Sequence, residues 1–179
     1  LREGAQTAGW TNPKANSINA AIGRGMAIAD QPPGSGQSTA KVALDEDGKA
    51  RLLMSLWDTG TGAHTVLRQV VAEELTIPIE NVGIVVEDTD AVDFDSGSGG
   101  SRVTYTAGRS VLGASENLRE KLITFAGELL NCAPEQLTLA DGRVKQNLPE
   151  GQQPQEIPLA ELAARAADAA RGPLLGENT

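Results

Sequence analysis

Two short loops of glycine and hydroxyl residues constrain the fold of this chain more than any other feature. The second, residues 95–101, reads Asp-Ser-Gly-Ser-Gly-Gly-Ser and is followed at once by Arg102. The first, residues 58–62, reads Asp-Thr-Gly-Thr-Gly. Each loop runs directly into a segment with helical spacing, so backbone N–H groups, hydroxyls and a positive helix end are expected in one place. Such an arrangement suits a polyanionic ligand, above all its phosphate groups.

The apolar spacing around these loops predicts a two-layer fold, α+β or α/β, in which a mixed sheet packs against helices. Apolar residues recur at helical spacing after each loop, and a short apolar run between the two helices indicates a buried strand. Asp141-Gly142 is typical of a hairpin tip. The expected order is β-β-β-α-β-α-β-β-α: strands at 26–29, 38–44 and 50–57, a helix that begins after Gly62 and ends by Pro78, a strand at 82–86, a helix at about 101–131, a hairpin at 137–144 and a helix at 159–170.

The length of 179 residues is enough for one domain with one core. We expect a connector over residues 1–20, the domain itself over residues 21–172, and a tail over residues 173–179. The connector lacks periodicity, and Gly172-Pro173 should stop the last helix. Residues 148–156 are expected to form a polar loop, and the tail has no visible partner in the sequence.

Composition excludes several classes of function. The net charge is −9 with no basic block, so a nucleic-acid partner is not expected. No apolar run reaches membrane length, and the single cysteine, Cys132, fits a reducing cytoplasm, where we expect the protein. One histidine and one cysteine cannot form a His/Cys zinc site. Aromatic residues make up only 3%, so aliphatic side chains must build the core.

Both loops also have a purely structural interpretation, which the residues alone leave open. The first would be a strand-to-helix turn in which a threonine caps the helix and glycines allow the bend. The second would be a flexible linker, although the strand before it and the long helix after it leave little to link. In the functional interpretation, Gly60 and Gly62 let the backbone approach a ligand closely, and Arg102 places a cation beside the serines of the second loop.

Other polar residues near the loops carry weaker signals. His64, at the start of the first helix, is either a general base or a locally hydrogen-bonded side chain. Four aspartates alternate along the segment before the second loop, where they could bind a hard cation or form a solvated face. We assign no catalytic and no metal-binding residue. These aspartates are Asp88, Asp90, Asp93 and Asp95.

The two loops, in this order and spacing, resemble the molybdenum hydroxylases, the family of xanthine dehydrogenase and aldehyde oxidase. The similarity is to the second molybdopterin-binding domain of the large subunit, and it covers nearly all of the chain. Residues 95–104 carry it most strongly, together with the first loop and Thr65. Further matches are Gly23-Arg-Gly25, Asp45-Glu-Asp-Gly48, Ala72-Glu-Glu-Leu75, Asp88-Thr-Asp90, Ala8-Gly9-Trp10 and Pro158-Leu-Ala-Glu-Leu162.

The resemblance implies a molybdopterin cofactor, either alone or in its dinucleotide form, used to hydroxylate an aldehyde or an N-heterocycle. It implies that iron–sulfur clusters and FAD are held by other domains or subunits, and that the rest of the molybdenum subunit is a partner of this segment. In the family a glutamine between the glycines of the first loop contacts the cofactor, and here that position is Thr61. The cofactor-binding residues implied here are Gly60, Thr61, Gly62, Ser96, Gly97, Ser98, Gly99, Gly100 and Ser101.

Two parts of the family pattern are absent from this sequence. The first cofactor domain should precede it, and the catalytic glutamate of a Gly-Glu motif should follow it; Gly176-Glu177 comes too early for that role. We therefore expect an excised segment, or one piece of a split or degenerate subunit, that is inactive alone. The alternatives are a non-catalytic relative that acts as a binding or assembly module, and an unrelated phosphate- or nucleotide-binding domain.

Overall fold

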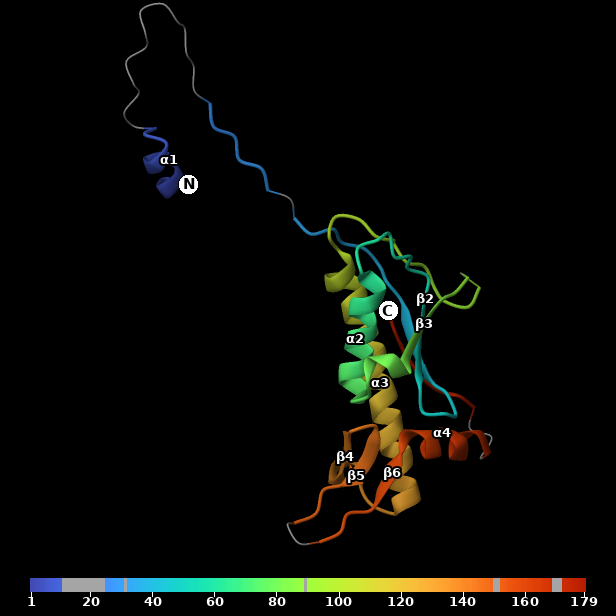
Figure 1. Cartoon of the computed structure of the whole chain (residues 1–179). Helices are drawn as coiled ribbons and strands as arrows, with labels where there is room; N and C mark the ends of the chain where they lie inside the picture. The colour runs from blue at the N-terminus through green and yellow to red at the C-terminus, as the bar shows by residue number, and fades with distance from the viewer. Residues whose placement is uncertain (11–24, 31, 89, 150–151, 169–171) are drawn as a thin grey trace, which may run out of the picture. The chain divides into compact units, whose positions relative to one another are not determined.

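The computed structural model describes residues 1–10, 25–30, 32–88, 90–149, 152–168 and 172–179 (Figure 1). It divides into two units, residues 1–31 and residues 32–179. In the first unit, helix α1 (Arg2–Thr7) lies within the expected connector. Residues 25–30 are exposed and form no strand, so the strand expected at 26–29 is wrong. Residues 11–24, which hold Gly23-Arg24 and the second half of the connector, lie outside the described residues.

The second unit is built on a four-stranded mixed sheet in the order β3-β2-β1-β7. Strands β1 (Ala40–Leu44) and β2 (Ala50–Met54) pair antiparallel across a tight turn in which the Gly48 N–H donates to the Asp45 carbonyl at 2.9 Å. Strand β3 (Val82–Val86) runs parallel to β2, because helix α2 (Ala63–Leu75) provides the crossover between them. The expected hairpin and crossover helix are confirmed. The strand at 82–86 also forms, but it is an edge strand in which only Val82 is buried, so the expectation of a buried strand is wrong.

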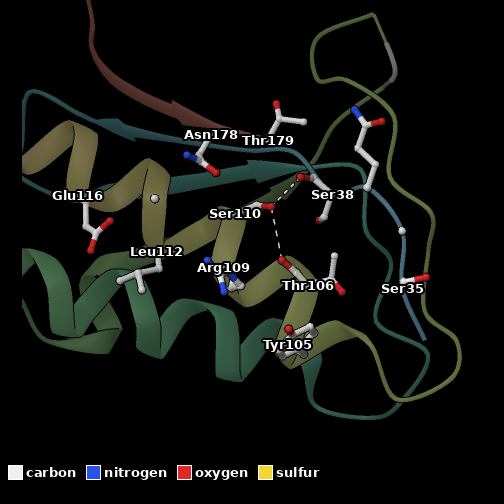
Figure 2. A pocket seen from close by; sticks show the side chains of 13 residues that line it. Ser35, Ser38, Tyr105, Thr106, Arg109, Ser110, Leu112, Glu116, Asn178 and Thr179 are labelled. Atoms are coloured by element: carbon white, nitrogen blue, oxygen red, sulfur yellow. Dashed lines mark hydrogen bonds between the residues drawn. The ribbon is translucent and has the colours of Figure 1, made fainter. Parts of the chain in front are cut away.

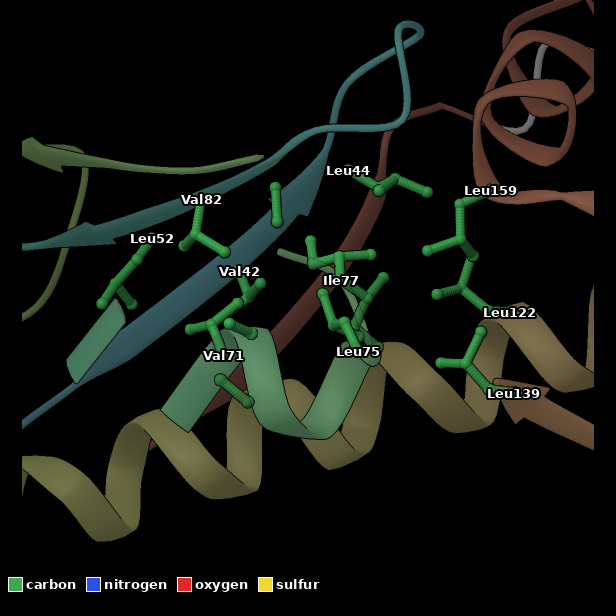
Figure 3. Close-up of a cluster of buried hydrophobic side chains, with 14 of the residues drawn as sticks. Val42, Leu44, Leu52, Val71, Leu75, Ile77, Val82, Leu122, Leu139 and Leu159 are labelled. Carbon is green, nitrogen blue, oxygen red and sulfur yellow. The ribbon is translucent and has the colours of Figure 1, made fainter. Parts of the chain in front are cut away.

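Helices α2 and α3 (Val103–Leu130) pack side by side on one face of this sheet (Figure 1). Aliphatic side chains fill the space between the layers: Val42 and Leu52 point from the strands toward Val71 and Leu75 of α2 (Figure 3). All four are fully buried. The two-layer α+β architecture predicted from the sequence is therefore confirmed. The core is built mainly from aliphatic side chains, joined by Phe125.

A second, three-stranded sheet lies at the far end of α3, in the order β4-β5-β6. The expected hairpin is β4 (Leu137–Ala140) and β5 (Arg143–Gln146), and helix α4 (Leu159–Asp168) follows β6 (Glu156–Pro158). Sequence reasoning missed β6 because it assigned these residues to a polar loop and to the helix start. Two short 3₁₀ turns, Ile79–Asn81 and Pro134–Gln136, precede β3 and β4.

The segment expected to be a tail is part of the main sheet. Strand β7 (Leu174–Asn178) pairs antiparallel with β1 and packs against α3. Gly176 makes this packing possible, because a Cβ there would lie 2.0 Å from the Ala114 carbonyl oxygen and 2.6 Å from the Leu118 nitrogen. The Gly176-Glu177 pair is thus explained by packing in a strand. Among the described residues, no helix is long and apolar enough to cross a membrane.

Candidate functional site

The two glycine-rich loops lie at the same edge of the main sheet. Each leads from the end of a strand to the start of a helix, and the Ser98 hydroxyl donates to the Trp57 carbonyl at 3.2 Å, which joins the second loop to the start of the first. Between them is a cavity of about 400 Å³. The cavity is lined by Thr59, Thr61, Ala63, Val66, Ser98, Gly99, Ser101, Arg102, Val103 and Thr104.

Asp58 organises the first loop from within. Its Oδ1 accepts the N–H groups of Gly60 and Thr61, each at 2.9 Å, and its Oδ2 accepts the N–H of His64 at 3.2 Å. Desolvation opposes ionisation, but the N–H donors of His64, Gly60 and Thr61 together hold the pKa of the Asp58 carboxyl below its ordinary value. Gly60 and Gly62 adopt φ of 93° and 76°, which suit glycine.

His64 is locally hydrogen-bonded. Its Nε2 lies 2.9 Å from the Leu56 carbonyl oxygen, so this nitrogen carries the proton and donates it to the backbone. The histidine therefore ties the start of α2 to the end of the strand segment before the loop. Of the two roles considered from the sequence, the structure supports local hydrogen bonding.

The second loop is held from behind by a buried ion pair. Arg102 Nη1 lies 3.4 Å from Asp95 Oδ1, and the two side chains are only 4% and 2% exposed. Asp95 Oδ1 also accepts the Gly97 N–H at 2.6 Å, and Asp95 Oδ2 accepts the Ser38 hydroxyl. Arg102 donates further to the carbonyls of Gly97 and Gln37. The guanidinium of Arg102, which the sequence placed beside the serines, therefore binds groups of the protein itself.

Residues 34–38 form a strap along the back of the second loop. The Gly34 N–H donates to the Gly100 carbonyl at 2.5 Å, the Gln37 N–H donates to the Ser96 hydroxyl at 3.0 Å, and the Ser96 N–H donates back to the Gln37 carbonyl at 3.0 Å. Sequence reasoning missed the contact of this strap with the second loop. The only signal for it was the closely spaced pair Gly34 and Gly36, where a Cβ would collide with the loop.

The strap is also attached to α3, at the edge of a larger hollow of about 900 Å³. Figure 2 shows Ser110 of α3 linked to Ser38 and Thr106, with the Ser110 hydroxyl 2.6 Å from the Ser38 carbonyl. The hollow also borders the end of β7, where Asn178 and Thr179 lie (Figure 2). The strap therefore lies between this hollow and the second loop.

The front of the second loop keeps its hydrogen-bond donors available. The N–H groups of Ser98, Gly99, Gly100 and Ser101 donate to no other residue that the structure describes. The first three N–H groups of α3 also have no hydrogen-bond partner among the described residues. A Cβ built at Gly60, Gly62, Gly97 or Gly99 would meet no atom within 4 Å. The loops thus offer donors and open space together.

The sequence-predicted residues divide into two sets within this arrangement. Thr61, Ser98, Gly99 and Ser101 line the cavity. Gly60, Gly62 and Gly97 shape the loops at positive φ, while Ser96 and Gly100 contact the strap. The alternating aspartates gather no cation site: across the described ranges, no group of three or more acidic, histidine or cysteine side chains could hold a metal ion.

Comparison with known proteins identifies the family. The family model for the molybdopterin cofactor-binding domain matches residues 3–178, almost the whole chain. The chain belongs to this family. The match excludes the alternative of an unrelated phosphate- or nucleotide-binding domain, and it agrees with the resemblance seen in the two loops.

Curated relatives place this cofactor-binding domain within larger proteins. The chain is 35% identical over 133 residues to a probable hypoxanthine oxidase of Escherichia coli strain K12, covering 73% of the chain and 14% of the relative. It is 30% identical over 154 residues to a putative xanthine dehydrogenase molybdenum-binding subunit of the same strain, covering 80% of the chain and 20% of that protein. The chain therefore spans a fifth or less of the length of these relatives.

Solved structures share the fold of this molybdopterin cofactor-binding domain. Quinoline 2-oxidoreductase from Pseudomonas putida 86 superposes with a TM-score of 0.67 at 29% identity, over 81% of this chain and 19% of that one. A Cu,Mo-CO dehydrogenase superposes with a TM-score of 0.69 at 25% identity, over 79% and 18% respectively. The names of the similar proteins are those of oxidoreductases, two of them named with molybdenum, and this chain corresponds to one segment of them.

Proposed function

We propose that the chain is the part of a molybdenum hydroxylase large subunit that holds the anionic side of molybdopterin between its two glycine-rich loops. The observation that carries the proposal is the cavity shared by the loops in a domain of the molybdopterin-binding family. Its volume of about 400 Å³ lies within the range of roughly 300–1,000 Å³ that is typical of small-molecule sites.

The residues of the cavity fit a phosphate-bearing cofactor. Backbone N–H groups of Ser98, Gly99 and Ser101 have no hydrogen-bond partner in the part of the chain that the structure describes, and the start of α3 adds its positive helix end. The absence of a Cβ at Gly99 leaves room for the ligand to approach the backbone. Oxygen atoms of a phosphate group would accept these donors, with the hydroxyls of Thr61 and Ser98 beside them.

The role of these residues is to bind and orient. When bound, the cofactor would supply the redox chemistry that hydroxylates an electron-poor carbon. The backbone donors would hold its anionic end, and the ordered first loop, pinned by Asp58, would close the other side of the cavity. No side chain of this segment is proposed as the catalytic base.

The complete protein needs more than this segment. We propose that the rest of the molybdenum subunit completes the cofactor site, and that iron–sulfur and flavin groups on other domains or subunits carry electrons away. The substrate proposed is an aldehyde or an N-heterocycle, the classes suggested by relatives named as aldehyde oxidoreductase and xanthine dehydrogenase molybdenum-binding subunits. This proposal prefers a catalytic assembly over a non-catalytic binding module.

The site can be tested by filling the space above the second loop. A leucine at Gly99 would project into open space, so Gly99→Leu should fold normally but obstruct the ligand. Gly83→Leu is the matched control, because that glycine lies in β3 away from the loops and its Cβ would make only ordinary contacts. Binding would be followed by amide NMR shifts during titration with molybdopterin released from a loaded enzyme.

We expect shifts at the two loops in the wild type and in Gly83→Leu, and their loss in Gly99→Leu. The isolated chain should bind the cofactor only weakly, because one loop pair buries little of the ligand and cannot offset its lost freedom. Shifts confined to other parts of the domain, or equal binding by Gly99→Leu, would contradict the site. Tight stoichiometric retention of molybdopterin by the chain would contradict the proposal that a second part of the subunit completes it.

A further inference from the structure

Two charged residues form an ion pair at the back of the second loop. Asp95 and Arg102 have side chains that are almost completely buried, and their polar atoms are directed to each other, to the loop backbone and to the strap. Neither can serve as a surface charge for an anionic ligand. Any effect of these two residues on binding must therefore pass through the loop backbone.

The contacts of the pair define the shape of the loop at both ends. Asp95 captures the N–H of Gly97 directly after the loop begins, and Arg102 returns from its far end to the Gly97 carbonyl. The residues between them, 98–101, form the arch whose N–H groups have no partner among the described residues. Because both ends of the arch are held, its backbone cannot fold back to bond its own N–H groups, and these donors stay available to a ligand.

The strap makes this fastening part of the domain. Ser38 donates its hydroxyl to Asp95, and its carbonyl accepts from Ser110 of α3. The Gln37 carbonyl accepts both Arg102 Nη2, at 2.8 Å, and the Ser96 N–H. Through the strap, the loop is attached to α3 and to the residues that lead into β1, two elements of the core, so its conformation does not depend on its own glycine-rich sequence alone.

Stability alone is a poor explanation for this arrangement. Burying two charges removes their hydration, and Arg102 Nε is buried without a hydrogen-bond partner among the described residues. An apolar pair of similar size would avoid that cost. A planar guanidinium, in contrast, can contact Asp95 and two carbonyls in fixed directions, which a single point charge cannot do.

We propose that Asp95 and Arg102 are positioning residues, which together with Ser38 of the strap hold the N–H groups of residues 98–101 ready for the anionic part of the ligand. The inference rests on the proposed function, because it concerns how that site is prepared. According to this inference the loop is ordered before the ligand binds, so that no conformational entropy of the loop is lost on binding.

The test uses the 179-residue chain with inorganic pyrophosphate as the probe. Binding is measured by amide NMR titration, and amide hydrogen exchange is measured without any ligand at Ser96, Gly97 and Arg102, the loop residues whose N–H groups are hydrogen-bonded. The variants are Asp95→Asn, Arg102→Lys and the milder Ser38→Ala, which removes one contact to Asp95 and should fold even if the others do not. The matched control is Arg119→Gln, which breaks an ion pair with Glu74 between α3 and α2, away from the loops.

We expect the apparent Kd for pyrophosphate to rise at least about tenfold in Asp95→Asn and Arg102→Lys, since a free energy near that of ordering a single residue corresponds to such a factor. Ser38→Ala should shift it in the same direction by less, and Arg119→Gln should leave it unchanged. Loop exchange should accelerate in the first three variants while exchange in β1 and β2 stays that of the wild type. A general loss of stability would instead accelerate both.

The affinity of Arg102→Lys for pyrophosphate separates positioning by the guanidinium from simple attraction by a positive charge. If this variant keeps the wild-type affinity, the positive charge is sufficient and the inference is wrong. Unchanged affinity and exchange in Ser38→Ala and Asp95→Asn would also overturn it, while leaving the proposed site intact. If the wild type shows no pyrophosphate shifts at the loop, the proposed site itself fails, whatever the exchange rates of the variants.

Discussion

Alanine in place of Gly176 is expected to separate β7 from α3. The added Cβ would lie 2.0 Å from the Ala114 carbonyl oxygen and 2.6 Å from the Leu118 nitrogen, both backbone atoms of a long helix. A flexible side chain could turn aside, but helical backbone cannot move without losing its own hydrogen bonds. The strand must therefore shift away, although its pairing with β1 opposes this.

The size of the effect follows from the clash and from what it detaches. Overpacking a core usually costs about 1–3 kcal/mol and sometimes more, and a contact with fixed backbone belongs at the upper end. We expect a loss of about 3 kcal/mol, which for a chain of this size lowers the Tm by roughly 6–12 °C. If β7 detaches by itself, the cost is capped at its docking free energy, and the N–H groups of β1 that face it become exchangeable.

Gly108→Ala is the matched control, with the opposite sign. Gly108 lies within α3, and a Cβ there would meet nothing within 4 Å. Alanine favours a helix interior over glycine by about 0.8–1 kcal/mol, so this variant should raise the Tm by roughly 2–4 °C. Thermal unfolding followed by far-ultraviolet circular dichroism measures both. A Tm of Gly176→Ala within a degree of the wild type would refute the close packing of β7 on α3.

Three further variants test the core, the first loop and the cavity. Leu122→Ala should lower the free energy of urea unfolding by about 2–5 kcal/mol, because Leu122 is completely buried. Asp58→Asn should remove a stabilisation that is present above the ordinary Asp pKa and is lost as the pH falls through the lowered folded value, so urea midpoints of wild type and variant should converge in acid; a constant difference would contradict this. Thr61→Gln, which restores the amide typical of the family, should strengthen molybdopterin binding by roughly twofold to tenfold in the same NMR titration, and no change would indicate that position 61 does not meet the ligand.

The local sequence pattern was sufficient to predict the amphipathic helices and the hairpins. The helices α2 and α3 and the hairpins could be predicted because each presents a periodic apolar face or a turn residue at the required place. The 26–29 segment was misread for the same reason: a short apolar run looks like a strand, but in the structure it has no strand partner among the described residues. Strand β7 was missed for the opposite reason: it is a real strand, but its partner, β1, lies about 130 residues away in the sequence.

The sequence by itself determined the two donor-rich loops, the helices they begin and the family to which the domain belongs, because each of these depends on residues close together in the chain. Only the tertiary structure decided what each polar residue does. It placed Ser98 against Trp57, so that two loops share one cavity, and it buried Arg102 behind the loop instead of exposing it to a ligand. Those outcomes depend on hydrogen bonds between residues 41 and 65 positions apart, which local spacing does not encode.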